Sequence, residues 1–181
     1  MKKSLLKLIE YSILPAICIF AAKLAGIFVT GLIFNIPIDL RNQAQGLLFF
    51  QTLVPQADMI VVITYSDLFM YLVVVLGMTV ILIRSVYFHD SHISSTMVSR
   101  LAKYNLLGLM QSSYELYHSG MIWLAFLWCA NVLIGINVYR GLTETWALAV
   151  TVLFSLSYSI IFFKDLLAEI QLSNDGNLAK T

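Results

Sequence analysis

Four apolar stretches, each long enough to cross a lipid bilayer, constrain this chain more than any other feature. A helix needs roughly 20 mostly apolar residues to span the hydrocarbon core. The stretches cover residues 13–34, 59–83, 121–138 and 145–163. Composition agrees, because only 12% of the residues are charged, about half the share in a soluble domain. The sequence therefore predicts an all-α, polytopic integral membrane protein, a four-transmembrane-helix bundle that forms a single membrane domain over residues 1–181.

The last two apolar stretches predict a helical hairpin. Neither contains a charged residue, and the only charges between Met121 and Phe163 are Arg140 and Glu144. Gly141 lies between these two charges and favours a tight turn, because glycine adopts left-handed backbone angles at little cost. We therefore expect two antiparallel helices joined by a short turn.

A cleaved signal peptide is the alternative interpretation of the first stretch, because Lys2 and Lys3 precede an apolar run. A second apolar run, Leu24–Phe34, follows Lys23 and makes the stretch too long for the apolar core of a signal peptide. We expect a signal anchor that stays in the membrane.

Lysine and arginine are distributed unevenly between the two sides of the predicted membrane domain. Such residues are enriched on the cytoplasmic side. With the N-terminus inside, the cytoplasmic segments hold Lys2, Lys3, Lys7, Arg84, Arg100, Lys103, Lys164 and Lys180, whereas the outer segments hold Arg41 and Arg140. The bias predicts a cell (inner) membrane protein with both termini in the cytoplasm.

Two connections contain segments that favour short interfacial helices. Residues 40–54 include an apolar run that is too short to span and is bounded by Gly46 and Pro55. Residues 95–110 form an amphipathic pattern with Arg100 and Lys103 on the polar side. This second segment fits either a helix on the inner membrane surface or a loop helix packed on the bundle.

The end of the chain predicts a short helical extension beyond Lys164. Leu166, Leu167 and Ile170 recur at helical spacing, and Asn174-Asp175-Gly176 is typical of a helix break that leads into a free tail.

Small residues mark faces on which helices pack closely in lipid. Such residues recur in the first span as Ala22 and Gly26, and in the fourth span as Ala147, Thr151, Ser155 and Ser159. These faces fit packing within the bundle or a contact between subunits.

Lys23 is the most informative single residue, because a basic side chain near the middle of a span costs about 2.5 to 3.5 kcal/mol on insertion scales. Asp67 is the acidic residue expected within another span, one to two turns nearer the outer surface. A pair between them is one hypothesis. The other is that Asp67 lies at the interface while Lys23 snorkels or contacts carbonyl groups. Asn131, with Tyr65, Ser66 and Tyr71, is a candidate member of a polar network around a pair.

Histidines and acids cluster near the expected inner end of the bundle. Glu115 and His118 have the Glu-x-x-His spacing of helical di-metal sites, and His89 and His92 lie in the preceding connection. A second Glu-x-x-His is missing, so we interpret the cluster as a polar rim rather than a metal site. We expect no cofactor.

Two function classes remain. The first is a non-enzymatic multi-pass protein, either a subunit of a larger membrane assembly or a small oligomeric channel or transport unit with Lys23 and Asp67 as its polar element. The alternative is a membrane-embedded enzyme with a cytoplasmic His/Glu metal site. The expected partners are the lipid bilayer and further copies or other membrane subunits, and no nucleic acid is expected.

Overall fold

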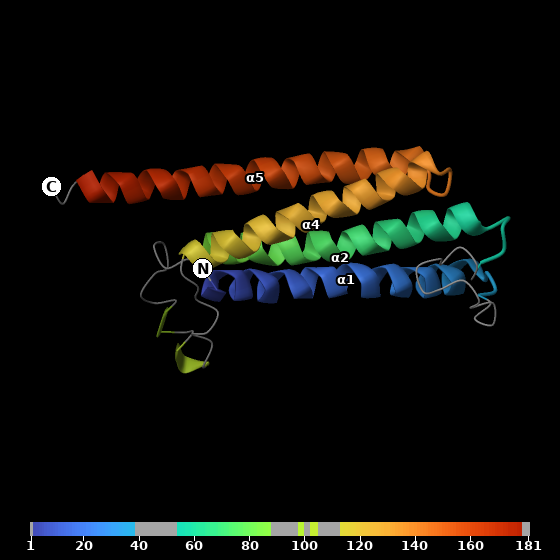
Figure 1. Cartoon of the computed structure of the whole chain (residues 1–181), viewed down its shortest axis with the longest axis horizontal. Helices are drawn as coiled ribbons and strands as arrows, with labels where there is room; N and C mark the ends of the chain where they lie inside the picture. The colour runs from blue at the N-terminus through green and yellow to red at the C-terminus, as the bar shows by residue number, and fades with distance from the viewer. Residues whose placement is uncertain (1, 39–53, 88–97, 100–101, 105–112, 179–181) are drawn as a thin grey trace.

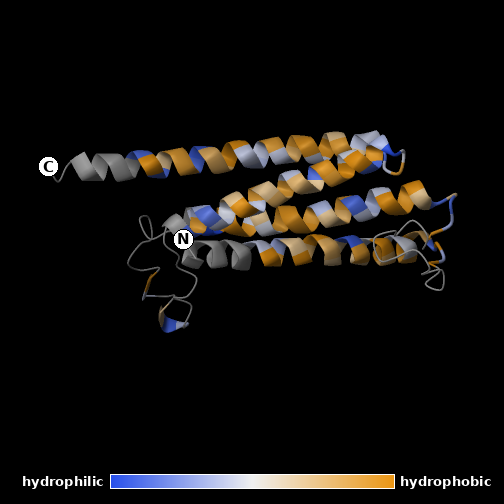
Figure 2. Ribbon diagram, viewed as in Figure 1, coloured by the Kyte–Doolittle hydropathy of each residue, from blue (hydrophilic) through white to orange (hydrophobic). Residues whose placement is uncertain are grey.

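The computed structural model describes residues 2–38, 54–87, 98–99, 102–104 and 113–178. Within these residues the chain forms four long helices, and the predicted all-α membrane bundle is confirmed. The helices are α1 (Lys2–Phe34), α2 (Met59–Tyr87), α4 (Ser113–Tyr139) and α5 (Thr145–Leu178), which run side by side along one axis (Figure 1). Apolar residues predominate along all four (Figure 2).

Each helix contains an apolar segment that is long enough to cross a membrane, at Ser12–Phe34, Met59–Ser85, Glu115–Tyr139 and Thr145–Gln171. The last two segments extend further than hydropathy alone predicts. A helix that is already formed adds polar residues at small cost each, so it does not stop where the apolar run stops. The chain is therefore a multi-pass membrane protein.

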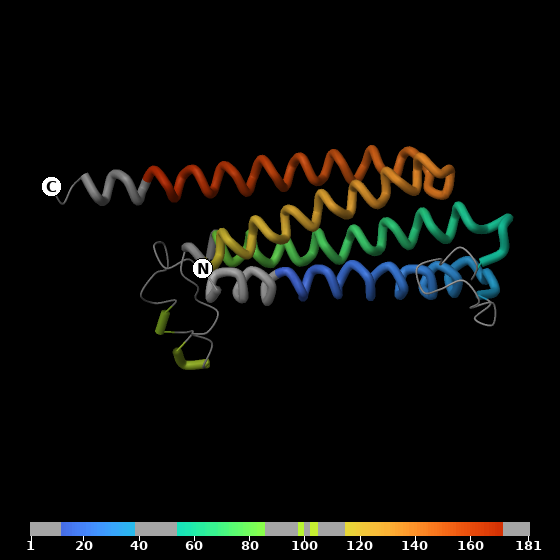
Figure 3. The backbone as a smooth tube through the Cα atoms, in the orientation of Figure 1, coloured from blue at the N-terminus to red at the C-terminus, as the bar shows by residue number. Residues whose placement is uncertain are grey.

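The bundle has two distinct ends. We call the end where α4 and α5 are joined the hairpin end (Figure 3), and the opposite end, where α1 begins and α5 ends, the terminal end (Figure 1). Helix α2 packs against each of the other three helices, whereas α5 lies at one edge and packs against α4 and α2. Side chains from α2, α4 and α5, including Val74, Met78, Leu127, Ile134 and Phe162, form a fully buried core.

Glycines allow the helices to pack closely, with a neighbouring backbone at Gly26 and an aromatic ring at Gly120. A Cβ atom at Gly26 of α1 would lie 2.8 Å from the Ser66 Cα of α2, and one at Gly120 of α4 would lie 2.4 Å from the ring of Phe162. Close backbone approach matters in lipid, because apolar contact with another helix has no advantage over apolar contact with lipid tails.

Helices α1 and α4 end in the same way. Asn35 and Gly141 have positive φ angles of 54° and 69°, and the next residue donates back to a carbonyl oxygen of the last turn. Ile36 N donates to Gly31 O, and Leu142 N donates to Asn137 O, both at 2.9 Å. These bonds satisfy carbonyl groups that a helix end leaves open. The turn predicted at Gly141 is confirmed.

Helix α5 corrects one prediction. It continues through Asn174-Asp175-Gly176 to Leu178, where the sequence favoured a break. Extending a formed helix through a glycine costs only about 1 kcal/mol. The extended end of α5 projects beyond the other three helices (Figure 1). The predicted interfacial segment 40–54 lies outside the described residues except for Val54, and 95–110 lies outside them except for residues 98–99 and 102–104.

Candidate functional site

The structure brings Lys23 of α1 and Asp67 of α2 together as an ion pair inside the bundle. The Lys23 ammonium also donates to Ser66 Oγ at 2.8 Å and lies 3.5 Å from the carbonyl oxygen of Ile63. Asp67 is only 1% exposed. Because the opposite charge and the hydroxyl group replace much of the lost hydration, a lysine can remain within a span without a water-filled cavity.

Asp67 accepts hydrogen bonds from two further side chains. Asn137 Nδ2 donates to both carboxylate oxygens, at 2.9 and 3.2 Å, and Thr143 Oγ1 donates to Oδ2 at 2.6 Å. One carboxylate thus binds an ammonium from α1, an amide from α4 and a hydroxyl from the α4–α5 turn. We call Lys23, Ser66, Asp67, Asn137 and Thr143 the carboxylate centre.

The α4–α5 turn brings Thr143 to the same carboxylate as Asn137, which lies in the last turn of α4. Leu142 N and Gly141 N donate to the carbonyl oxygens of Asn137 and Val138, which bends the chain back directly after α4. Thr143 follows this bend and reaches Asp67 from the far side of the turn. Glu144 N donates to Thr64 Oγ1 at 3.0 Å and ties the start of α5 to α2, one turn from Asp67.

The sequence offered the Lys23–Asp67 pair as one of two hypotheses, and the structure shows that pair. Ser66 joins the pair as expected. Tyr65 does not, because it is 44% exposed and its ring lies 5.2 Å from that of Phe34. Asn137 and Thr143 were missed. The sequence feature that could have identified them is the turn at Gly141. Asn137 precedes this turn and Thr143 follows it, so both lie at the same end of the bundle as Asp67.

Asn131 and Tyr71 belong to a second polar cluster nearer the middle of the bundle. Tyr71 Oη donates to the carbonyl oxygen of Thr151 at 2.7 Å and lies 2.7 Å from Ser155 Oγ. Asn131 Nδ2 donates to Ser155 Oγ at 2.6 Å and to Leu127 O at 3.2 Å. Asn131 Oδ1 is buried and has no partner among the described residues. A buried acceptor of this kind calls for a donor such as a water molecule.

Two more contacts join α2 to α5 towards the terminal end. Thr79 Oγ1 lies 2.7 Å from Tyr158 Oη, and Ser85 donates to Asp165, which also accepts from Tyr117 Oη at 3.0 Å. We call the polar contacts from Asp67 to Ser85 along α2 the polar seam. Its ends are 18 residues apart, about 27 Å by helix rise, which is close to the hydrocarbon thickness of a bilayer.

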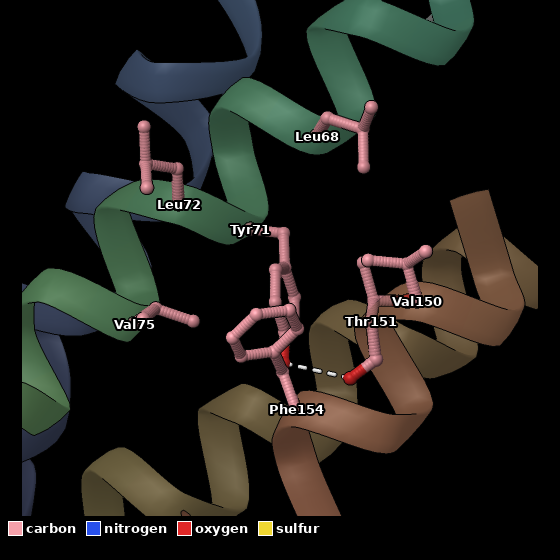
Figure 4. A pocket seen from close by; sticks show the side chains of 7 residues that line it. All are labelled: Leu68, Tyr71, Leu72, Val75, Val150, Thr151 and Phe154. Carbon is pink, nitrogen blue, oxygen red and sulfur yellow. Dashed lines mark hydrogen bonds between the residues drawn. The ribbon is translucent and has the colours of Figure 1, made fainter.

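An apolar groove of about 280 Å³ lies between α2 and α5 beside the polar seam (Figure 4). Leu68, Leu72, Val150 and Phe154 line it together with Tyr71, Val75 and Thr151. The hydrogen bond between Tyr71 and Thr151 occupies the polar groups of this region (Figure 4). The groove therefore suits lipid tails or an apolar helix face rather than a polar ligand.

The small residues of the predicted packing faces lie inside the bundle. Ala147, Thr151 and Ser155 are fully buried, and Ala22 and Gly26 are buried on the side of α1 that meets α2. Ser159 is partly buried and accepts a hydrogen bond from Trp128 Nε1 at 3.2 Å. The positions of these residues favour packing within the chain over a contact between subunits.

The remaining candidates divide between described and undescribed residues. Glu115 and His118 lie in the first turns of α4, while His89, His92 and Arg100 fall outside the described residues. Lys103 is exposed. Within the described ranges, no three residues of the metal-ligating types come together.

We predict that Tyr71→Phe lowers the free energy of unfolding by about 1 to 2 kcal/mol, because it removes a hydroxyl group that serves Thr151 and Ser155 in a dry interior. Thermal unfolding in detergent measures this change. Tyr65→Phe is the matched control, since the Tyr65 side chain faces outward. Equal stability of the two variants would contradict the assignment of Tyr71 to the polar seam.

The chain matches no protein-family model, no curated protein and no solved structure. Its own residues define it as a multi-pass membrane protein with four candidate spans and a buried Lys23–Asp67 pair.

Proposed function

We propose that the protein is a non-enzymatic membrane subunit that works within an assembly of its own copies or of other membrane proteins, with the carboxylate centre as its structural core. The observation that carries this proposal is that the Asp67 carboxylate is shielded from solvent and bound by side chains of the same chain. Asp67 is 1% exposed, and its carboxylate accepts from Lys23, Asn137 and Thr143 of the same chain.

A closed centre is suited to holding helices rather than to binding a substrate. A catalytic or transport carboxylate must exchange partners with water, a proton or a ligand during its cycle. Asp67 would have to release two neutral donors and a lysine to do so. Removing any of these partners leaves a buried charge with less compensation, which is costly.

The faces of the bundle support a role within an assembly. Large apolar side chains are exposed along all four helices. Inside the membrane, such faces can contact either lipid tails or the apolar face of another helix. The extended end of α5 also carries exposed Leu167 and Ile170 beyond Lys164, where the chain becomes polar. A membrane protein with these faces and a closed interior is well suited to bind neighbouring helices.

A small transport unit is the second candidate, and the polar seam favours it. The hydroxyl groups of Tyr71, Thr79 and Tyr158 lie between the two carboxylates Asp67 and Asp165. Hydroxyl groups can both donate and accept, so they can pass a proton where water links them. Asn131 Oδ1, which has no partner among the described residues, is a suitable acceptor for one such water.

We further propose that the terminal end faces the cytoplasm of a cell membrane, because eight lysines and arginines flank the spans there against two at the hairpin end. In a background that lacks Cys18 and Cys129, Ser91→Cys and Asn174→Cys should resist an impermeant thiol reagent in intact cells. Gln45→Cys should react. Labelling of Ser91→Cys with protection of Gln45→Cys would reverse the orientation.

The assembly proposal predicts that the detergent-solubilised protein is larger than one 20.4 kDa chain. Light scattering with detergent correction gives the protein mass, and mass spectrometry identifies any partner chains. A monomer at all protein concentrations would contradict the proposal. Proton or ion flux in liposomes that is abolished by Tyr71→Phe but retained by Tyr65→Phe would instead favour the transport unit.

A further inference from the structure

The polar cluster formed by Tyr71, Asn131, Thr151 and Ser155 has a definite hydrogen-bond direction. The single hydroxyl proton of Tyr71 goes to the carbonyl oxygen of Thr151, at 2.7 Å. Tyr71 Oη is therefore the acceptor in its 2.7 Å contact with Ser155 Oγ, and the Ser155 hydroxyl group is the donor. Ser155 Oγ in turn accepts from Asn131 Nδ2 at 2.6 Å. The chain of donors runs from Asn131 through Ser155 to Tyr71 and ends on a backbone carbonyl group.

These bonds use every side-chain donor of the cluster. Asn131 Nδ2 carries two protons, and the second goes to Leu127 O at 3.2 Å. The hydroxyl proton of Thr151 goes to Leu148 O at 3.0 Å. Asn131 is only 4% exposed, and its Oδ1 atom is buried without a partner among the described residues. Because an unpaired acceptor in a dry interior is costly, Oδ1 needs a molecule that brings its own proton.

The orientation of the Asn131 amide follows from the same contacts. Exchanging its oxygen and nitrogen would leave the oxygen 3.2 Å from Leu127 O with no proton between the two atoms. It would also require the Ser155 hydroxyl proton for the Asn131 oxygen, so one of the two 2.7 Å contacts of Tyr71 would have no proton. The exchange therefore loses two hydrogen bonds, and Oδ1 remains the atom that needs a partner.

The surroundings of Oδ1 select water among the small donors. Asn131 lies eight residues before the end of α4 at Tyr139, about 12 Å by helix rise, so the hydroxyl groups of lipid headgroups lie well above it. A cation would need a negative charge to offset its own. The described hydrogen bonds of the four cluster residues include no carboxylate. Water is neutral and small enough for an enclosed polar position.

A water molecule beside Oδ1 also has a second partner within the cluster. Buried waters typically make two to four hydrogen bonds. One proton of the water goes to Asn131 Oδ1. The hydroxyl oxygens of Ser155 and Tyr71 each accept one bond in the arrangement above and keep one lone pair, so either can accept the other proton.

We propose that Asn131 Oδ1 binds a single water molecule enclosed among α2, α4 and α5. This water completes the hydrogen bonding of the cluster and gives the Asn131 amide one fixed orientation towards Ser155. The site goes beyond the proposed function and does not depend on it, because one chain supplies all the residues that form it.

A density map of the full-length protein that resolves ordered water tests this site directly. We expect one peak about 2.5 to 3.0 Å from Asn131 Oδ1 in the parent chain. Asn131→Leu, which has a similar size and no polar atom, should lose the peak. Val132→Leu is the matched control and should retain it, because Val132 is the next residue of α4 and is 61% exposed.

Infrared spectroscopy in membranes gives a second readout. Exchange into oxygen-18 water shifts the O–H stretching band of a bound water molecule, and we expect Asn131→Leu to lose a band that the parent chain and Val132→Leu both show. A band of equal intensity in Asn131→Leu would overturn the site. A parent map with no peak beside Oδ1, with a cation there, or with a protein donor there would do the same. Because the parent map needs no substitution, it decides the question even if Asn131→Leu does not fold.

Discussion

The rest of the structure depends on one carboxylate. Asp67 is buried within α2, which like α4 contacts all three other helices, and it accepts from Lys23 on α1, Asn137 on α4 and Thr143 in the α4–α5 turn. Burial of either charge alone would be costly in lipid. Together, and with the neutral donors around them, they fix the rotation and depth of three helices at once. Apolar contacts cannot do this, because they are equally satisfied by lipid.

The remaining interior uses the two other devices available in a membrane. Glycines and small residues allow close contact, as where Gly26 meets Ser66 and where Ala147, Thr151 and Ser155 form the buried face of α5. Hydroxyl and amide groups then connect the helices in the polar seam, from Tyr71 with Ser155 to Ser85 with Asp165. Each such bond contributes modestly, about 0.6 kcal/mol on average in a helical membrane protein. Their number and spacing along α2 specify how α5 is placed.

The sequence predicted the positions of the membrane spans well, but it predicted poorly which side of each helix faces which neighbour. Hydropathy located the four spans, and charge made Lys23 and Asp67 candidate partners although Asp67 was expected one to two turns nearer the outer surface. Whether a residue joins the carboxylate centre also depends on the rotation of its helix about the helix axis. The sequence pattern did not predict this rotation. Asn131 and Asn137 are six residues apart, so they lie about 120° apart around α4. The first therefore meets Ser155 of α5 and the second meets Asp67 of α2. The predicted break at Asn174-Asp175-Gly176 was wrong because local preference for a turn is small compared with the cooperativity of a long helix.

A double-mutant cycle on the carboxylate centre tests the central claim most directly. Lys23→Met, Asp67→Asn and the double variant are compared with the parent chain by thermal unfolding in detergent. If the pair holds the bundle, each single variant is strongly destabilised, and the double variant loses less than the sum by at least about 1 kcal/mol. Effects that add to within about 0.5 kcal/mol would show that the two residues do not interact and would contradict this account of the fold.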